Sequence, residues 1–141
     1  MKELIIELPI RVKKNRFKDN KHYAINLNQY RNWNYKVETS VKKKYKEIIY
    51  SKLPKIKLNK INIETQLYLK TTNKDGSESK TRKDKGNVYA IALKYFLDAL
   101  VEKNILTDDN DNYVKQEIIK PTISVNSPDL EKIVFKITEI N

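Results

Sequence analysis

The sequence predicts an α+β domain in which a small mixed β-sheet is packed by two main helices. Apolar residues recur at three- and four-residue intervals over 28–53 and 87–103, which indicates two helices. They alternate with polar residues over 61–69, which indicates a half-buried strand. Shorter apolar runs near both ends of the chain predict further strands. The resulting order of strands and helices implies a mixed sheet with helices on it, and a single domain spanning 1–141 fits this length.

The beginning of the chain predicts two short strands separated by a basic segment. Lys2–Leu8 (KELIIEL) is expected to form a strand that Pro9 closes. Residues 11–21 are rich in Lys and Arg and poor in apolar side chains, which favours a basic loop or arm. A strand is expected to resume over 22–25, with His22 as a structural or surface residue.

A long amphipathic helix is expected over 28–53, with Asn26 or Asn28 as its N-cap and Pro54 at its end. Tyr30 and Trp33 belong to its apolar pattern, so we expect them in the core; stacking on bases is the alternative. The other faces carry many cations, which fit either a solvated face or contacts to phosphates. These cations are Arg31, Lys36, Lys42, Lys43, Lys44, Lys46 and Lys52.

The middle of the chain predicts a strand, a loop and the more apolar of the two helices. The strand 61–69 is followed by NKDGSESK at 73–80, which is typical of a loop or hairpin tip. The helix 87–103 leaves only a narrow polar stripe, so we expect it to pack on the sheet. The stripe consists of Asn87, Lys94, Asp98 and Glu102, and a Lys94–Asp98 surface ion pair would account for two of them.

An acidic loop, Asp108–Asp111, follows the second helix, and strands are expected over 113–119 and 133–140 with turns between them. The loop does not fit the EF-hand pattern of a calcium site. That pattern needs a glycine where this chain has Tyr113 and a glutamate where it has Ile119. An ordinary polar loop is the simpler alternative.

The net charge of +11 is concentrated at the start of the chain. Residues 1–60 hold 17 Lys and Arg against 5 Asp and Glu, whereas residues 61–141 hold 12 against 13. Such asymmetry favours a nucleic-acid backbone as the partner. A general solubility charge in a Lys-rich proteome is the alternative.

Composition limits the chemistry of any metal site. The chain has no cysteine and one histidine, which excludes disulfides, thiolate sites and multi-histidine centres. A bound metal would therefore be a hard cation with oxygen ligands, namely Mg²⁺, Mn²⁺ or Ca²⁺. The start shows no signal-peptide pattern and no apolar run is long enough to span a membrane, so we expect an intracellular protein without a membrane partner.

Several short motifs resemble one family in order and spacing. They are KDKGN at 83–87, KYFLDAL at 94–100 and ILTDD at 105–109, preceded by LNQYRN at 27–32. Together they resemble the RusA-type endodeoxyribonucleases, Holliday junction resolvases common in phages and prophages. The resemblance implies a RusA-like fold and a role in DNA recombination and repair.

The resemblance also implies a metal-dependent site for phosphodiester cleavage. Asp84 matches the first metal-binding aspartate, and Asp109 matches the metal ligand of the Asp-Asp pair, with Asp108 beside it. Lys94 matches the lysine that supports the attacking water or the transition-state phosphate. Mg²⁺, or Mn²⁺ in its place, would activate the water and stabilise the leaving oxygen. Asp84 and Asp109 can share an ion if the chain folds back over the sheet.

The implied substrate is branched double-stranded DNA, such as a four-way junction, in the cytoplasm of a bacterial host. Paired nicks require two active sites, so a homodimer is expected. The resemblance assigns backbone contacts to Arg82, Lys83 and Lys85. The basic first part of the chain adds further expected contacts at Lys13, Lys14, Arg16, Arg31, Lys42, Lys43 and Lys46.

The sequence departs from the family pattern in two places. Gly86 stands where the pattern has a second aspartate, and matching Lys94 requires about four extra residues at the start of the helix. Asn87 or Asp98 would then have to complete the metal site. One carboxylate fewer favours a second hypothesis, a weak or inactive member that binds branched DNA or a protein partner without cutting. A third hypothesis, an RNA-binding, ribosome-associated protein, gives Asp108 and Asp109 no role.

Overall fold

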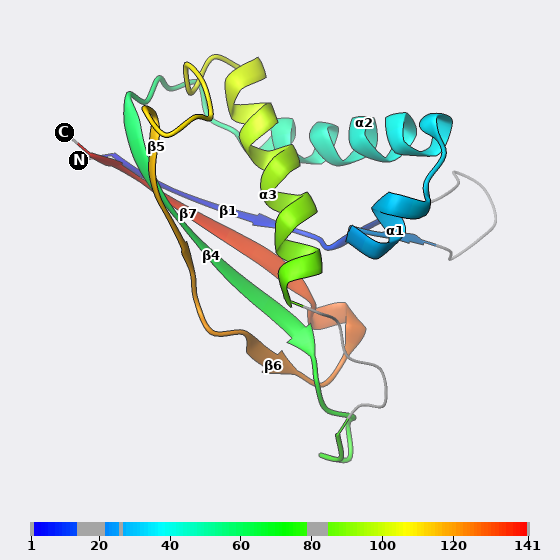
Figure 1. Ribbon diagram of the computed structural model, residues 1–141. Helices are drawn as coiled ribbons and strands as arrows, with labels where there is room; N and C mark the ends of the chain where they lie inside the picture. Colours follow the sequence, from blue (N-terminus) through cyan, green and yellow to red (C-terminus); the bar gives the residue numbers. More distant parts are fainter. Residues whose placement is uncertain (1, 14–21, 26, 79–84, 141) are drawn as a thin grey trace.

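The computed structural model describes residues 2–13, 22–25, 27–78 and 85–140 (Figure 1). The class predicted from the sequence is confirmed, because helices pack on a mixed sheet. The strands are β1 (Glu3–Leu8), β2 (Arg11–Lys13), β3 (His22–Ala24), β4 (Lys60–Lys70), β5 (Val114–Ile119), β6 (Ile123–Val125) and β7 (Lys132–Ile140). The helices are α1 (Leu27–Asn32), α2 (Tyr35–Lys52), α3 (Lys85–Glu102) and the short 3₁₀ helix η1 (Pro128–Leu130).

The main sheet is centred on two antiparallel strands, β4 and β7. Its order is β1–β7–β4–β5, and β6 pairs with β4 beyond the end of β5. β7 is antiparallel to both β1 and β4, whereas β5 and β6 are parallel to β4. The parallel pair requires a crossover connection, which α3 supplies. A second, two-stranded sheet consists of β2 and β3.

The alternating residues of β4 and β7 make one face of the sheet apolar. Ile63 pairs with Ile137, and Leu67 pairs with Ile133, and all four side chains are fully buried. The residues between them point to the other face, where β4 and β7 are only half-buried. A period of two residues thus separates a core face from a solvated face.

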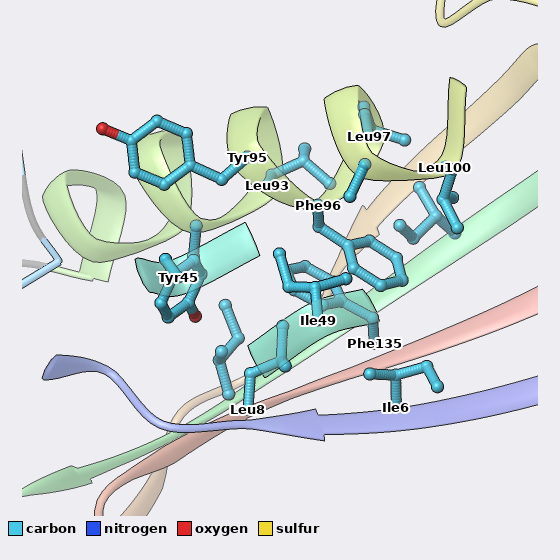
Figure 2. Packing of buried hydrophobic residues seen from close by; sticks show 14 of the residues in the cluster. Ile6, Leu8, Tyr45, Ile49, Leu93, Tyr95, Phe96, Leu97, Leu100 and Phe135 are labelled. Atoms are coloured by element: carbon cyan, nitrogen blue, oxygen red, sulfur yellow. The ribbon is translucent and has the colours of Figure 1, made fainter. Parts of the chain in front are cut away.

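Both long helices contribute side chains to the core on that apolar face (Figure 2). Phe96 of α3 stacks on Phe135 of β7 with ring centroids 4.4 Å apart. Tyr45 and Ile49 of α2 are fully buried in the same cluster, beside Tyr95 of α3. The wide apolar face of α3 therefore packs on the sheet, as predicted. None of the described helices is long and apolar enough to cross a membrane.

The helix predicted over 28–53 is instead two helices with a break at Trp33 and Asn34. Asn34 has an extended backbone, and its side-chain oxygen accepts a hydrogen bond from the Val37 N–H at 2.9 Å. Asn34 is therefore the N-cap of α2. Of the two positions suggested as N-caps from the sequence, 28 lies within α1 and 26 lies outside the described residues. Tyr30 and Trp33 are partly buried and pack edge to face, with ring centroids 5.9 Å apart, which fits the expected core role.

The predicted basic loop over 11–21 is wrong for its first three residues, which form β2. Val12 is buried, and Arg11 pairs with the carboxylate of Glu131, whose side chain has no exposed surface. The second carboxylate oxygen of Glu131 accepts a hydrogen bond from the Lys70 N–H at 2.9 Å. This ion pair links the small sheet to the end of the main sheet. Residues 14–21 lie outside the described part of the chain.

We expect Phe135→Ala to lower the free energy of unfolding by about 3–5 kcal/mol, because it leaves a cavity beneath Phe96. Val134→Ala, one residue away on the half-buried face, should cost about 1 kcal/mol or less. Urea denaturation followed by circular dichroism would measure both. Equal losses would contradict the assignment of the core face.

Candidate functional site

The acidic loop is a set of local turns beyond the C-terminal end of α3. The Asp108 carboxylate accepts hydrogen bonds from the Asp109 N–H at 2.8 Å and from the Asn110 amide at 3.1 Å. Buried Ile105 and Leu106 anchor the chain just before it, and Ile105 accepts a hydrogen bond from the Leu58 N–H at 2.7 Å. The loop is thus held at a defined place while its carboxylates remain at the surface.

The environment of Asp109 raises the pKa of its carboxyl group. Partial burial raises its pKa, and hydrogen bonding with Asp108 raises it further. The negative charges of Asp108 and Asp98 act in the same direction. A bound divalent cation would relieve this repulsion, so the donor set fits the oxygen ligands that Mg²⁺ prefers.

Lys94 is exposed in the middle of α3 and belongs to a short polar chain. Its ammonium donates to the Tyr30 hydroxyl at 3.2 Å, and that hydroxyl donates to Glu38 at 3.1 Å. The hydrogen bond to Tyr30 raises the pKa of Lys94, and nearby negative charges, including Asp98, raise it further. Lys94 is therefore a stable cation near neutral pH, which suits contact with a phosphate and not proton abstraction. The hydrogen bond from Tyr30 to Glu38 was not anticipated from the sequence.

Asp98 and Glu102, two further members of the polar stripe of α3, face α2. Asp98 lies 3.9 Å from the Lys42 ammonium, so its ionic partner is on α2 and not at Lys94. Glu102 accepts hydrogen bonds from both Lys46 and Tyr50. This corrects the assignment of Lys46 to nucleic-acid binding, because its side chain is almost buried, with 8% of the residue exposed, and its charge is paired.

Among the described residues, Asn87 and Asp109, two of the predicted metal ligands, are not brought together. Asn87 is half-buried in the first turn of α3, whereas Asp109 lies beyond the opposite end of that helix (Figure 1). An 18-residue helix is about 27 Å long. Within the described ranges, no three Asp, Glu or His side chains are grouped so that they could hold a metal ion. Asp84 lies outside these ranges, so its sharing of an ion with Asp109 stays a prediction.

The predicted nucleic-acid contacts divide into two groups. Positions 14, 16, 82 and 83 lie outside the described residues, as do the side chains of Lys13 and Lys85. Arg31 and Lys43 are exposed on α1 and α2, and Lys42 is half-buried. Arg31 and Lys43 have no ionic partner in the described part of the chain, which leaves them available to an anion.

We define the α2 basic face as Tyr35, Lys36, Lys42 and Lys43. The pairs 35/42 and 36/43 are seven residues apart, which places each pair on one side of the helix. Tyr35 is 81% exposed and lines a shallow depression of about 390 Å³ together with Lys42 and Lys43. The sequence pattern did not single out Tyr35. Its exposure became visible only when the helix break placed it in the first turn of α2.

No protein-family model matches the chain, and no curated protein matches it. The likeness to the RusA-type nucleases therefore depends on the short motifs alone.

We expect Asp108→Asn to lower the pKa of Asp109 towards the usual aspartate value, since it removes a neighbouring negative charge. The direction of the shift affects cation binding. As the pH falls, a carboxyl group with a raised pKa becomes protonated at a higher pH than an ordinary aspartate does, and it then loses its affinity for a cation. An NMR pH titration of the Asp109 carboxyl carbon would measure the change. Asp111→Asn is the control, and an equal fall in that variant would contradict the assigned role of Asp108.

Proposed function

We propose that this protein is a magnesium-dependent, structure-specific DNA endonuclease that cuts four-way junctions as a homodimer. The α2 basic face is the observation that carries its DNA-binding part. Lys36 and Lys43 are exposed without ionic partners among the described residues, and Tyr35 stands exposed beside them. Unpaired ammonium groups on a rigid helix suit a polyanion, because each phosphate contact releases condensed counterions.

The lysines of the α2 basic face suit contacts to the DNA phosphates better than recognition of particular bases. Lysine is a flexible point charge that binds phosphates irrespective of sequence. The polar chain from Lys94 starts on α3 and ends on α2 at Glu38, which lines the same depression as Tyr35 and Lys42. DNA that contacts the Tyr35 and Lys42 side of α2 would thus pass closer to Lys94 than DNA on the Lys36 and Lys43 side.

The cleavage part of the proposal depends on the motif resemblance. Asp109, with Asp84, would hold the ion, and Asp108 keeps negative charge beside Asp109. A bound Mg²⁺ would supply an activated water and stabilise the leaving oxygen. The contribution of Lys94 is a fixed positive charge for the phosphate, since Tyr30 holds its ammonium in place. Two copies related by a two-fold axis would present two such sites to the two strands.

A second candidate function is binding of branched DNA without cleavage. Gly86, where the family pattern has a carboxylate, favours it. The α2 basic face serves this function equally well, because phosphate contacts need no metal.

We expect the protein to cleave a synthetic four-way junction in Mg²⁺. Asp84→Asn and Asp109→Asn should each slow cleavage by about 100-fold or more, because each removes a carboxylate that would hold the Mg²⁺ ion. Junction affinity, measured by gel shift, should stay within about threefold of the unmodified protein, since neither residue is on the α2 basic face. Binding without any cleavage by the unmodified protein would establish the second candidate. Stronger binding to single-stranded RNA would contradict both.

We expect the double variant Lys36→Gln/Lys43→Gln to bind the junction more weakly and with less salt dependence. Two lost phosphate contacts should reduce the slope of log affinity against log salt by about 2. Fluorescence anisotropy over a salt series would measure it. Lys74→Gln/Lys115→Gln removes the same charge from exposed sites on other elements. The same slope change in this control would show that general charge, and not the α2 basic face, binds the DNA.

A further inference from the structure

A second basic region surrounds a pocket at the C-terminal ends of α2 and α3. The pocket has a volume of about 580 Å³, within the range of about 300–1,000 Å³ typical of ligand sites. The proposed DNA contacts and metal ligands do not include any of its residues. It is lined by Tyr50, Leu53, Pro54, Lys55, Ile56, Lys57 and Lys103.

Backbone contacts fix the walls of this pocket. Pro54 prevents α2 from continuing, and the Leu53 N–H donates to the Tyr50 carbonyl at 3.3 Å to close the last turn. The segment is anchored again at Leu58, which is buried and donates its N–H to Ile105. The Tyr50 hydroxyl donates to Glu102 of α3, so the two helix ends are joined across the pocket.

The rim of the pocket carries uncompensated positive charge. Lys55 and Lys57 are exposed and have no ionic partner within the described ranges. Lys103 lies over the Tyr50 ring, with its ammonium 4.3 Å from the ring centroid. The nearby carboxylate of Glu102 is already paired with Lys46. The C-terminal ends of α2 and α3 each carry about half a negative charge, which offsets about one of the three lysine charges. A net charge of roughly +2 is therefore available to an anionic ligand.

The apolar floor of the pocket and its basic rim together determine which kind of ligand can bind. Leu53, Pro54 and Ile56 offer an apolar surface, whereas the side-chain polar groups free to interact are ammonium donors. A nucleobase edge presents donors as well as acceptors, and its donors would find no side-chain acceptor here. Lys103 also covers one face of the Tyr50 ring, which hinders base stacking. Carboxylates only accept hydrogen bonds, and apolar side chains need none.

We infer that this pocket binds an acidic peptide segment of a partner protein, in which carboxylates flank one or two bulky apolar side chains. The apolar side chains enter between Leu53 and Ile56, and the carboxylates meet Lys55, Lys57 and Lys103. Tyr50 lies 15 residues along α2 from Tyr35, a separation of about 22 Å. A peptide here therefore leaves the α2 basic face free, and the inference does not rest on the proposed nuclease function.

The test uses a short dye-labelled peptide of acidic residues that ends in a Leu-Phe pair, titrated with the full chain and followed by fluorescence anisotropy. We expect saturable binding that the triple variant Lys55→Gln/Lys57→Gln/Lys103→Gln weakens about tenfold or more. All three side chains are exposed, so the variant should fold, and circular dichroism checks this. The same peptide ending in Ser-Ser should lose most of its affinity, which tests the apolar floor without altering the protein.

Charge-matched controls separate this pocket from the DNA-binding surface. Lys36→Gln/Lys43→Gln/Lys115→Gln removes equal charge elsewhere and should bind the peptide normally, while the pocket variant should bind the four-way junction normally. The inference is overturned if the peptide fails to bind at about millimolar concentration, or if the control loses as much affinity as the pocket variant. It is also overturned if short single-stranded DNA displaces the peptide more effectively than unlabelled peptide does.

Discussion

The packing of α3 on the centre of the sheet is the contact on which the rest of the structure depends. The stacked rings of Phe96 and Phe135 lie in this contact, between α3 and β7. In the sheet, β7 pairs with β1 on one side and with β4 on the other. Because α3 also connects β4 to the parallel strand β5, displacing it would break the crossover as well as the core. The acidic loop and the lysine-rimmed pocket both follow from where this helix ends.

The wide apolar face of α3 limits the residues through which α3 can contact α2. With only a narrow polar stripe left, α3 meets α2 through a ladder of polar pairs at Asp98 and Glu102. Lys46 is almost buried in this ladder, and Lys42 lies 3.9 Å from Asp98 but also lines the depression beside Tyr35, whereas Lys36 and Lys43 face solvent. A run of lysines that looks uniform in sequence thus divides into a structural set and a set that is available to ligands. The division decides which lysines belong in a proposed interface.

Periodicity predicted the elements that are long enough to show it. β4, β7 and α3 were found because many residues repeat one pattern, whereas β2 and β6, with three residues each and no period, were missed. The break at Asn34 was missed because the apolar spacing continues across it. For the candidate site, the sequence singled out Lys94, Asp108 and Asp109, but not the hydrogen bonds that link Lys94 through Tyr30 to Glu38. Glu38 and the pocket around Tyr50 arise from contacts between distant segments, which no local pattern contains.

The ion pair between Arg11 and Glu131 limits which substitutions the sequence can accept during evolution. Replacing either residue alone would leave a charge without its partner, and at Glu131 that charge is fully enclosed, a loss of about 3–5 kcal/mol. Replacing both with apolar residues of similar volume removes the unpaired charge and should cost less, and what remains is the loss of the acceptor for the Lys70 N–H. The two positions are therefore expected to covary among homologous chains, although 120 residues separate them. A correlated pair at these positions would mark the attachment of the small sheet to the main one.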